Sequence, residues 1–305
     1  MKHFVAEWNH SAEELAALID LGLKAKANPE QYKDALRNRT AFLYFEKQSL
    51  RTRVTCEVGM NQLGGSALTQ TPEMGKIGVR ESVHDVAKNL ENWVDVIAMR
   101  TFSQTLVEEM ARWSSKPVVN LLTDELHPCQ MTADFITLKE KFGRLQGLKL
   151  AFVGDGNNVA HSLMLGGALM GMHVVVCGPR GFEPNARITD KARELASKNG
   201  ATIEYTQCLE TAVTGADAVY TDVWASMGQE KEAEQKNKIF RPYQVNEKVF
   251  GLAKPTAAFM HCLPAHRGEE VTDEVCDHPR SVIFQEAGNR LTAIKAVYLK
   301  LILGL

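Results

Sequence analysis

The sequence predicts an α/β protein built from two doubly wound domains, each a parallel sheet flanked by helices. Short apolar runs typical of buried strands alternate with amphipathic stretches typical of helices along most of the chain, and this alternation favours parallel sheets covered by helices. The chain has 305 residues, which exceeds the size at which a single hydrophobic core usually stops growing. We therefore expect residues 1–145 to form one domain and residues 146–305 the other.

The first half opens with a helix over residues 12–26, marked by a capping box with Ser11 at the N-cap and Glu14 three residues later. The apolar and amphipathic patterns then predict strands at 41–45, 94–99 and 117–120, and helices at 54–63, 81–90, 103–114 and 133–142. Residues 64–78 are rich in glycine, threonine and proline and are expected to form a loop.

The second half repeats the alternation and is again expected to be doubly wound. The predicted strands lie at 149–153, 173–177, 218–221 and 257–260, and the predicted helices at 158–170, 190–199 and 291–303.

Composition narrows the class of protein. The net charge of −2 gives no reason to expect a nucleic-acid or membrane partner. The N-terminus lacks the apolar core of a signal peptide, and no run of some 18 apolar residues follows. The six cysteines lack the close pairing of zinc or redox motifs, which in a chain of this size favours free thiols. We therefore expect a cytoplasmic protein.

Residues 49–53, Ser-Leu-Arg-Thr-Arg, give the clearest functional signal. They connect the predicted strand at 41–45 to the helix that follows, so two hydroxyls and two guanidiniums lie on a strand-to-helix turn. A helix N-terminus offers unpaired backbone N–H groups and a partial positive charge. The turn therefore predicts an anion site, with phosphate as the best-fitting anion. The alternative is a solvated helix cap with two surface arginines.

Further polar clusters follow other predicted strands, where ligands bind in open α/β sheets. Arg100 ends a strand, and at the same sheet edge as Arg51 it would allow two guanidiniums to share one dianion. Residues 127–130, His-Pro-Cys-Gln, precede a helix, and their imidazole and amide could hold a carbonyl group. A capping loop with a structural histidine is the alternative.

The segment after the strand at 149–153, Gly-Asp-Gly-Asn-Asn-Val, suggests a dinucleotide-binding loop, but its residues argue against one. Val159 occupies the place of the third glycine, and the next strand ends in Gly178-Pro179 without an acidic residue for a ribose. We expect no NAD. The asparagines at this turn could instead bind a small polar ligand.

Two loops in the second half carry side chains that could bind a ligand or take part in a reaction. Asp222 and Ser226 would suit an ammonium group, although an Asp-capped loop is the alternative. His261 and His266 could suggest a metal, but no His/Glu ligand spacing continues the pattern, so we expect no metal. Cys262 is either a nucleophile or an inert buried thiol.

Together these segments resemble the aspartate/ornithine carbamoyltransferase family from about the first helix to the last. The motifs Ser-x-Arg-Thr-Arg, His-Pro-x-Gln, Asp-x-x-x-Ser-Met-Gly and His-Cys-Leu-Pro occur in family order, and the last two indicate the ornithine branch. The resemblance implies a carbamoyl phosphate-binding domain over residues 1–145 and an ornithine-binding domain over residues 146–305. It also implies that the last helix, about 289–303, packs back on the first domain.

The resemblance implies a set of site residues. Those implied to bind carbamoyl phosphate are Ser49, Leu50, Arg51, Thr52, Arg53, Lys76, Arg100, His127, Gln130, Cys262, Leu263 and Arg290. Those implied to bind ornithine are Asn158, Asp222, Ser226 and Met227. The residues with catalytic roles would be Arg51, Arg100, His127 and Cys262.

Lys76 marks a departure from the family pattern. The family's anion site receives a residue from a loop of the neighbouring subunit, often glutamine or histidine in the ornithine branch, and the corresponding stretch here offers this lysine. The resemblance thus implies a homotrimer, or a trimer-based higher oligomer, with active sites at subunit interfaces.

The implied reaction transfers the carbamoyl group of carbamoyl phosphate to the δ-amine of L-ornithine, giving L-citrulline and phosphate, as in arginine biosynthesis and without a cofactor. Two alternatives remain open. A related carbamoyltransferase could use aspartate or an acylated ornithine, although Asp222 and Ser226 would repel the second carboxylate of aspartate. A homologue could also bind the ligands without catalysing their reaction.

Overall fold

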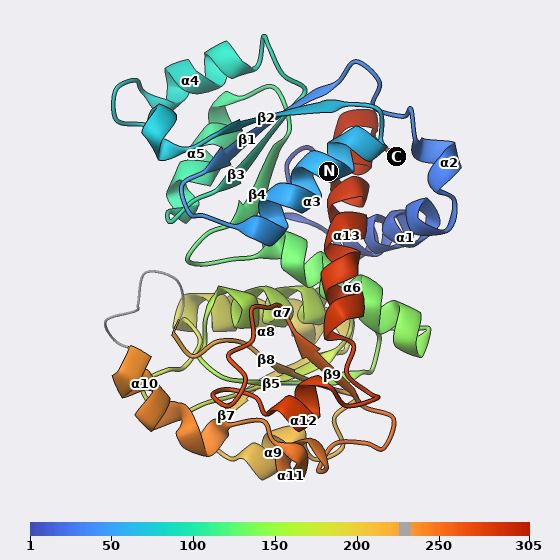
Figure 1. Cartoon of the computed structure of the whole chain (residues 1–305), viewed down its shortest axis with the longest axis vertical. Coiled ribbons are helices and arrows are strands. Elements are labelled where there is room, and N and C mark those ends of the chain that lie inside the picture. Colours follow the sequence, from blue (N-terminus) through green and yellow to red (C-terminus); the bar gives the residue numbers. More distant parts are fainter. Residues whose placement is uncertain (226–232) are drawn as a thin grey trace. The chain divides into compact units, whose positions relative to one another are not determined.

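The structure is a computed structural model that describes residues 1–225 and 233–305 (Figure 1). The chain divides into two compact units. Unit 1 comprises Met1–Ile136 and Gly288–Leu305, and unit 2 comprises Thr137–Ala287. The sequence placed the division after residue 145, whereas in the structure it falls inside a helix. Helices therefore continue across both points at which the chain passes from one unit to the other.

Unit 1 contains a four-stranded parallel sheet among its described residues, in the order β2-β1-β3-β4. Its elements, including the two helices that continue into unit 2, are η1 (Glu7–Asn9), α1 (Ala12–Ala27), α2 (Pro29–Tyr32), β1 (Thr40–Phe45), α3 (Leu50–Gln62), β2 (Ser66–Gln70), η2 (Pro72–Met74), α4 (Val83–Leu90), β3 (Val96–Arg100), α5 (Gln104–Trp113), β4 (Val118–Leu122), α6 (Pro128–Phe142) and α13 (Ile283–Leu303). The parallel sheet and its helices confirm the predicted fold class.

Strand β2 corrects one expectation, because the sequence predicted a loop over residues 64–78. Ser66–Gln70 instead pairs in parallel with β1 at the edge of the sheet. Its side chains are mostly exposed or half-buried, so the segment lacks the apolar run by which buried strands are recognised.

The core of unit 1 explains why the other strands were recognisable. All five residues of β3 and all five of β4 are buried, as expected for strands covered on both faces. On one face of the sheet, strand side chains such as Phe42 and Ile97 belong to the same apolar cluster as Val83 and Leu90 of α4 and Val107 of α5. These packed layers hold the strand ends in fixed positions.

Unit 2 contains a five-stranded parallel sheet among its described residues, in the order β7-β6-β5-β8-β9. Its elements are β5 (Lys149–Val153), α7 (Asn158–Leu169), β6 (His173–Cys177), α8 (Ala186–Asn199), β7 (Thr202–Thr206), α9 (Leu209–Val213), β8 (Ala218–Thr221), α10 (Ala233–Phe240), η4 (Arg241–Tyr243), α11 (Glu247–Phe250), β9 (Ala258–His261) and α12 (Asp273–Cys276). Strand β7 was not predicted, because it is a polar edge strand with two exposed residues.

In each sheet, successive strands are added in one direction from one central strand and in the opposite direction from its neighbour. The polar clusters lie at the ends of these two central strands. In unit 1 the pair is β1 and β3, whose last residues Phe45 and Arg100 lie side by side. In unit 2 it is β5 and β8, where Val153 pairs with Thr221. Ligands of open α/β sheets bind at such reversal points, beyond the carboxyl ends of the strands. Among the described helices, none is both long and apolar enough to cross a membrane.

Candidate functional site

The turn between β1 and α3 is organised by a helix cap. Ser49 has an extended backbone and occupies the N-cap of α3, where its hydroxyl accepts a hydrogen bond from the backbone N–H of Thr52 at 3.2 Å. This contact satisfies one backbone donor of the first helical turn. Thr52 is buried and Arg51 is half-buried, so the cap directs these two side chains differently.

Two buried guanidiniums meet at the hydroxyl of Thr52. Arg100, at the end of β3, donates from Nη1 to Oγ1 of Thr52 at 3.3 Å. Arg290, on α13, donates from Nη2 to the same oxygen at 2.9 Å. Both arginines are at least 95% buried. Because a neutral hydroxyl joins two charges that have lost most of their hydration, an anion bound here would be strongly favoured.

A second chain of hydrogen bonds leads from Arg290 into α6. Nη1 of Arg290 donates to Oε1 of Gln130. The amide nitrogen of Gln130 in turn donates to Oδ1 of Asp134 at 2.7 Å. All three side chains are buried. The network therefore ties α13 to the start of α6 and fixes Gln130 beside the guanidiniums.

His127 precedes α6 and is also buried. Its carbonyl oxygen accepts hydrogen bonds from the backbone N–H groups of Gln130 and Met131 at 3.0 and 3.2 Å, while Pro128 occupies the first helical position, which suits its fixed φ and missing N–H. Burial lowers the pKa of His127 well below its usual value, and nearby positive charges, led by Arg290 and Arg100, lower it further. The imidazole is therefore neutral near pH 7 and offers one N–H donor.

Three residues assigned to the anion site lie apart from this buried group. Arg53 is exposed and its Nε lies 3.8 Å from Oε1 of Glu57, one helical turn further on. The Leu50 side chain is exposed. Lys76 is exposed and its Nζ lies 2.7 Å from Oε1 of Glu46 in the same chain. Unit 1 thus brings together Thr52, Arg100, His127, Gln130 and Arg290 and leaves these three side chains on its surface.

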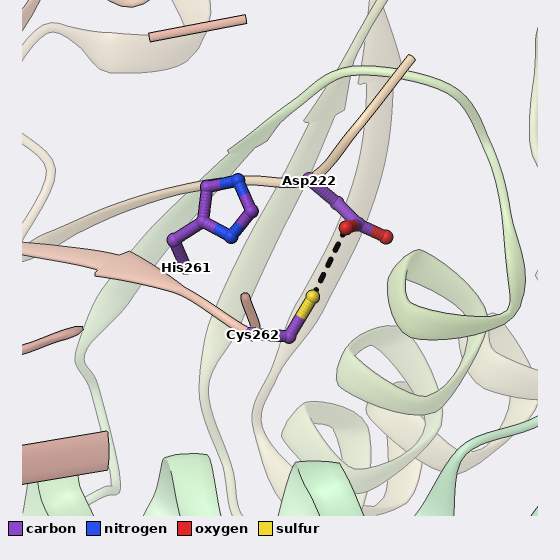
Figure 2. Close-up of side chains that lie close together, drawn as sticks. All are labelled: Asp222, His261 and Cys262. Carbon is purple, nitrogen blue, oxygen red and sulfur yellow. Dashed lines mark hydrogen bonds between the residues drawn. The ribbon is translucent and has the colours of Figure 1, made fainter. Parts of the chain in front are cut away.

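In unit 2, Asp222 is the centre of the cluster shown in Figure 2. It follows β8, is buried, and accepts a hydrogen bond on Oδ1 from Sγ of Cys262 at 3.0 Å. Oδ2 accepts another from Nδ2 of Asn157 at 2.8 Å. One side chain that follows the neighbouring strand β9 and one from the start of α7 thereby hold this carboxylate in place.

Asn157 is one of the two asparagines that the sequence placed at a ligand-binding turn, although the family resemblance assigned only Asn158 to the site. It caps α7, and its Oδ1 accepts hydrogen bonds from the backbone N–H groups of Val159 and Ala160. Because the amide oxygen of Asn157 accepts these bonds from the helix, its amide nitrogen points toward Asp222. The available signal was its position at the N-cap of the helix that follows β5. The predicted residue, Asn158, is the half-buried first residue of α7.

His261 is the last residue of β9 and directly precedes Cys262. It is completely buried, its Nδ1 accepts the backbone N–H of Leu263 at 2.9 Å, and its Nε2 lies 3.0 Å from Oε1 of Glu270. Because Nδ1 accepts, Nε2 carries the proton and donates to the carboxylate. The potential metal-ligand atoms of Asp222, His261 and Cys262 lie within 4.8 Å of one another. Cys262 is hydrogen-bonded to Asp222, and the pairing of β8 with β9 brings His261 to the same strand ends.

Leu263 is half-buried and packs against the apolar core of unit 2. The remaining predicted residues, Ser226 and Met227, lie outside the described residues. The part of unit 2 that the structure describes therefore brings Asp222, Cys262 and Asn157 together at the sheet edge.

The whole chain is similar to known carbamoyltransferases. Two family models match: "Aspartate/ornithine carbamoyltransferase, carbamoyl-P binding domain" over residues 2–140 and "Aspartate/ornithine carbamoyltransferase, Asp/Orn binding domain" over residues 146–301. A protein of Anoxybacillus flavithermus named ornithine carbamoyltransferase is 49% identical, over 99% of this chain and 96% of its own length.

Solved structures give the same picture. The ornithine carbamoyltransferase of Pyrococcus furiosus has a TM-score of 0.96 and 43% identity, with 100% of this chain and 98% of that chain covered. That of Thermus thermophilus has a TM-score of 0.89 and 43% identity, with 99% of each chain covered. The similarity therefore extends over both units.

The buried His127 should make the protein sensitive to acid. The unfolded chain takes up a proton at this residue as the pH falls below about 6.5, whereas the folded chain, with its lowered pKa, does not. Folding stability is therefore lost as the pH falls below that value. When the pH is lowered from 7 to 5, the unfolding free energy of the unaltered protein can be compared with that of the His127→Gln variant. We expect the decrease in the variant to be smaller than that in the unaltered protein, by up to about 2 kcal/mol. Urea unfolding at both pH values measures the difference, and identical losses would contradict it.

Proposed function

The chain belongs to the aspartate/ornithine carbamoyltransferase family, and from this premise we propose how its residues share the reaction. The protein transfers the carbamoyl group of carbamoyl phosphate to the δ-amine of L-ornithine, giving L-citrulline and phosphate. The structural observation that supports this function best is the pair of buried guanidiniums that meet at Thr52.

The phosphate end of carbamoyl phosphate binds at the start of α3. This end is a dianion, and the cap of α3 with the half-buried Arg51 offers a helix N-terminus and a positive charge side by side. The backbone of Leu50 contributes as the first residue of the helix. Hydrogen bonds to charged groups contribute about 1.5–3 kcal/mol each, so a few such donors suffice to hold the dianion.

The carbamoyl end binds among Arg100, His127 and Gln130. During attack, negative charge develops on the carbonyl oxygen, and a fixed guanidinium and a neutral imidazole N–H stabilise it without having to reorganise. Arg290 holds Gln130 in place and adds a second positive charge. Phosphate then leaves as an anion toward the same positive groups.

The acceptor end binds at the Asp222 cluster. The ornithine δ-amine must lose a proton before it can attack, and for an amine with a pKa near 10 this costs roughly 4 kcal/mol at pH 7. Cys262, hydrogen-bonded to Asp222, positions this amine and forms no covalent intermediate, because the amine itself is the nucleophile. Asp222 with Ser226 takes the α-ammonium group, and Asn158 with the backbone of Met227 takes the α-carboxylate.

A trimeric assembly accounts for the surface of unit 1. Four large apolar side chains on α3, β2 and the following segment are at least 59% exposed, namely those of Leu50, Leu68, Met74 and Val79. Such side chains would be removed from water if this face were buried between subunits. Lys76 lies among them in the sequence and would reach the anion site of a neighbouring subunit, where its charge suits a phosphate. We place this enzyme in arginine biosynthesis and in the cytoplasm, where its six free thiols remain reduced.

The choice of acceptor is tested by assaying carbamoyl transfer to ornithine, aspartate and N-acetylornithine in parallel, with carbamoyl phosphate as the donor. We expect citrulline from ornithine, and turnover of the other two acceptors at least about a hundredfold lower. N-acetylornithine lacks the α-ammonium group that would pair with Asp222, and aspartate has a second carboxylate that Asp222 would repel. Preferred turnover of either alternative acceptor would reassign the substrate, and no turnover of any would favour a non-catalytic homologue.

The division of labour between the two clusters is tested by a pair of substitutions. Arg51→Ala should lower kcat/KM for carbamoyl phosphate by about a hundredfold or more while the protein stays folded. Asp222→Asn should raise the KM for ornithine far more than that for carbamoyl phosphate. Steady-state kinetics with each substrate varied in turn, and circular dichroism as a folding control, provide the measurement. Near-normal activity of Arg51→Ala, or equal losses for both substrates in Asp222→Asn, would refute the assignment.

A further inference from the structure

Asp134 is a buried carboxylate to which the reaction as described gives no role. It lies on α6, one helical turn after Gln130, and is completely buried. Its Oδ1 accepts a hydrogen bond from Nε2 of Gln130 at 2.7 Å. An aspartate is almost never fully buried unless its carboxylate is bonded, so its place directly behind a substrate-binding amide calls for a physical explanation.

Two hydrogen-bond partners of Gln130 favour the same orientation of its amide. On one side stands a carboxylate, which as an ion only accepts hydrogen bonds, and on the other stands the guanidinium of Arg290, which only donates them. The amide nitrogen therefore faces Asp134 and the amide oxygen faces Arg290. The reverse orientation would set oxygen against oxygen and N–H against N–H.

This orientation determines which chemical group the amide presents to the ligand. Because the nitrogen is directed at Asp134, the atom on the side of the guanidinium pair is an oxygen, which is an acceptor. An amide oxygen has two lone pairs and can accept from Arg290 and from a ligand at once. A carbamoyl group carries an NH₂ that can donate to this oxygen, whereas an acetyl group carries a methyl that cannot.

We propose that Asp134 is a positioning residue that selects a carbamoyl over an acetyl phosphate by fixing the acceptor oxygen of Gln130 toward the ligand. The inference rests on the proposed function, since it takes Gln130 as the residue that contacts the carbamoyl group. Acetyl phosphate has the same phosphate and nearly the same shape, so phosphate contacts and size discriminate poorly between the two. A site built to pair with a ligand N–H rejects a ligand without it, because a buried polar group is then left unpaired.

The experiment measures the dissociation constants of carbamoyl phosphate, acetyl phosphate and inorganic phosphate by calorimetry, with freshly dissolved ligands. The preference ratio is the dissociation constant of acetyl phosphate divided by that of carbamoyl phosphate. We expect Asp134→Ala to lower this ratio about tenfold, because the amide nitrogen of Gln130 then loses its carboxylate partner and the amide is held less firmly by Arg290 alone. Inorganic phosphate should bind within about twofold of its usual affinity, because it contains no group for Gln130 to select. A merely structural role of Asp134 would weaken all three ligands together and leave the ratio unchanged.

Matched variants keep the test decisive. Asp134→Asn retains an oxygen that accepts from Gln130, and should keep most of the ratio. Gln130→Met, similar in shape but without the amide, should lose it, and Asp134→Ala should have no further effect in that background. Asp134→Ser keeps a polar side chain, but its hydroxyl is one bond too short to reach the amide of Gln130. It replaces Asp134→Ala if that variant does not fold, and its preference ratio must fall as well.

The outcomes separate this inference from the proposed function. If the unaltered protein forms citrulline and prefers carbamoyl phosphate, but Asp134→Ala or Asp134→Ser keeps that preference, the role of Asp134 is refuted while the function stands. That role is refuted as well if Asp134→Asn loses the ratio as completely as Asp134→Ala. If the unaltered protein shows neither citrulline formation nor a preference, the proposed function itself fails.

Discussion

The hydroxyl of Thr52, shared by two buried guanidiniums, is the interaction on which unit 1 depends. It joins the start of α3 to the end of β3 and to α13, whose Arg290 stands 238 residues further along the chain. Two buried positive charges that meet at one neutral oxygen repel each other, and this repulsion has a free-energy cost that a nearby anion would reduce. Any anion that binds only the folded state removes part of this cost and stabilises the unit. In the proposed function, the contacts that hold this unit together would therefore also provide its affinity for an anion.

Unit 2 has the opposite electrostatic character at its sheet edge. Its central group is a buried carboxylate, Asp222, oriented by Asn157 and Cys262. His261 and Glu270 form a second buried pair behind it, and the backbone N–H of His261 donates to Glu286 at 3.0 Å. The same doubly wound architecture therefore presents positive groups in one unit, which the proposed function assigns to a phosphate, and a negative group in the other, which it assigns to an ammonium group. The fold supplies the strand ends, and the side chains there decide the ligand.

The sequence predicted those features that depend on local patterns. Buried strands such as β3 and the strand-to-helix turn at residues 49–53 are visible as apolar runs and a helix cap. The edge strands β2 and β7 were not predicted, because half-exposed strands contain polar residues and lack a continuous apolar run. Contacts between distant segments could not be derived either. Arg290 was assigned only through the family resemblance, and the roles of Asn157 and Asp134 depend on which way an amide turns, which its neighbours in space determine.

The role of the shared hydroxyl is tested most directly by the affinity of Thr52→Val for carbamoyl phosphate, because this variant keeps the shape of threonine but removes the oxygen. Calorimetric titration without ornithine isolates this site. Since the lost contacts are hydrogen bonds to charged groups that hold both guanidiniums in place, we expect an affinity about 10- to 100-fold lower than that of the unaltered protein. Thr52→Ser, which keeps the oxygen, should bind nearly as well as the unaltered protein. An unchanged affinity in the folded Thr52→Val variant would contradict the claim that this hydroxyl organises the two guanidiniums into an anion site.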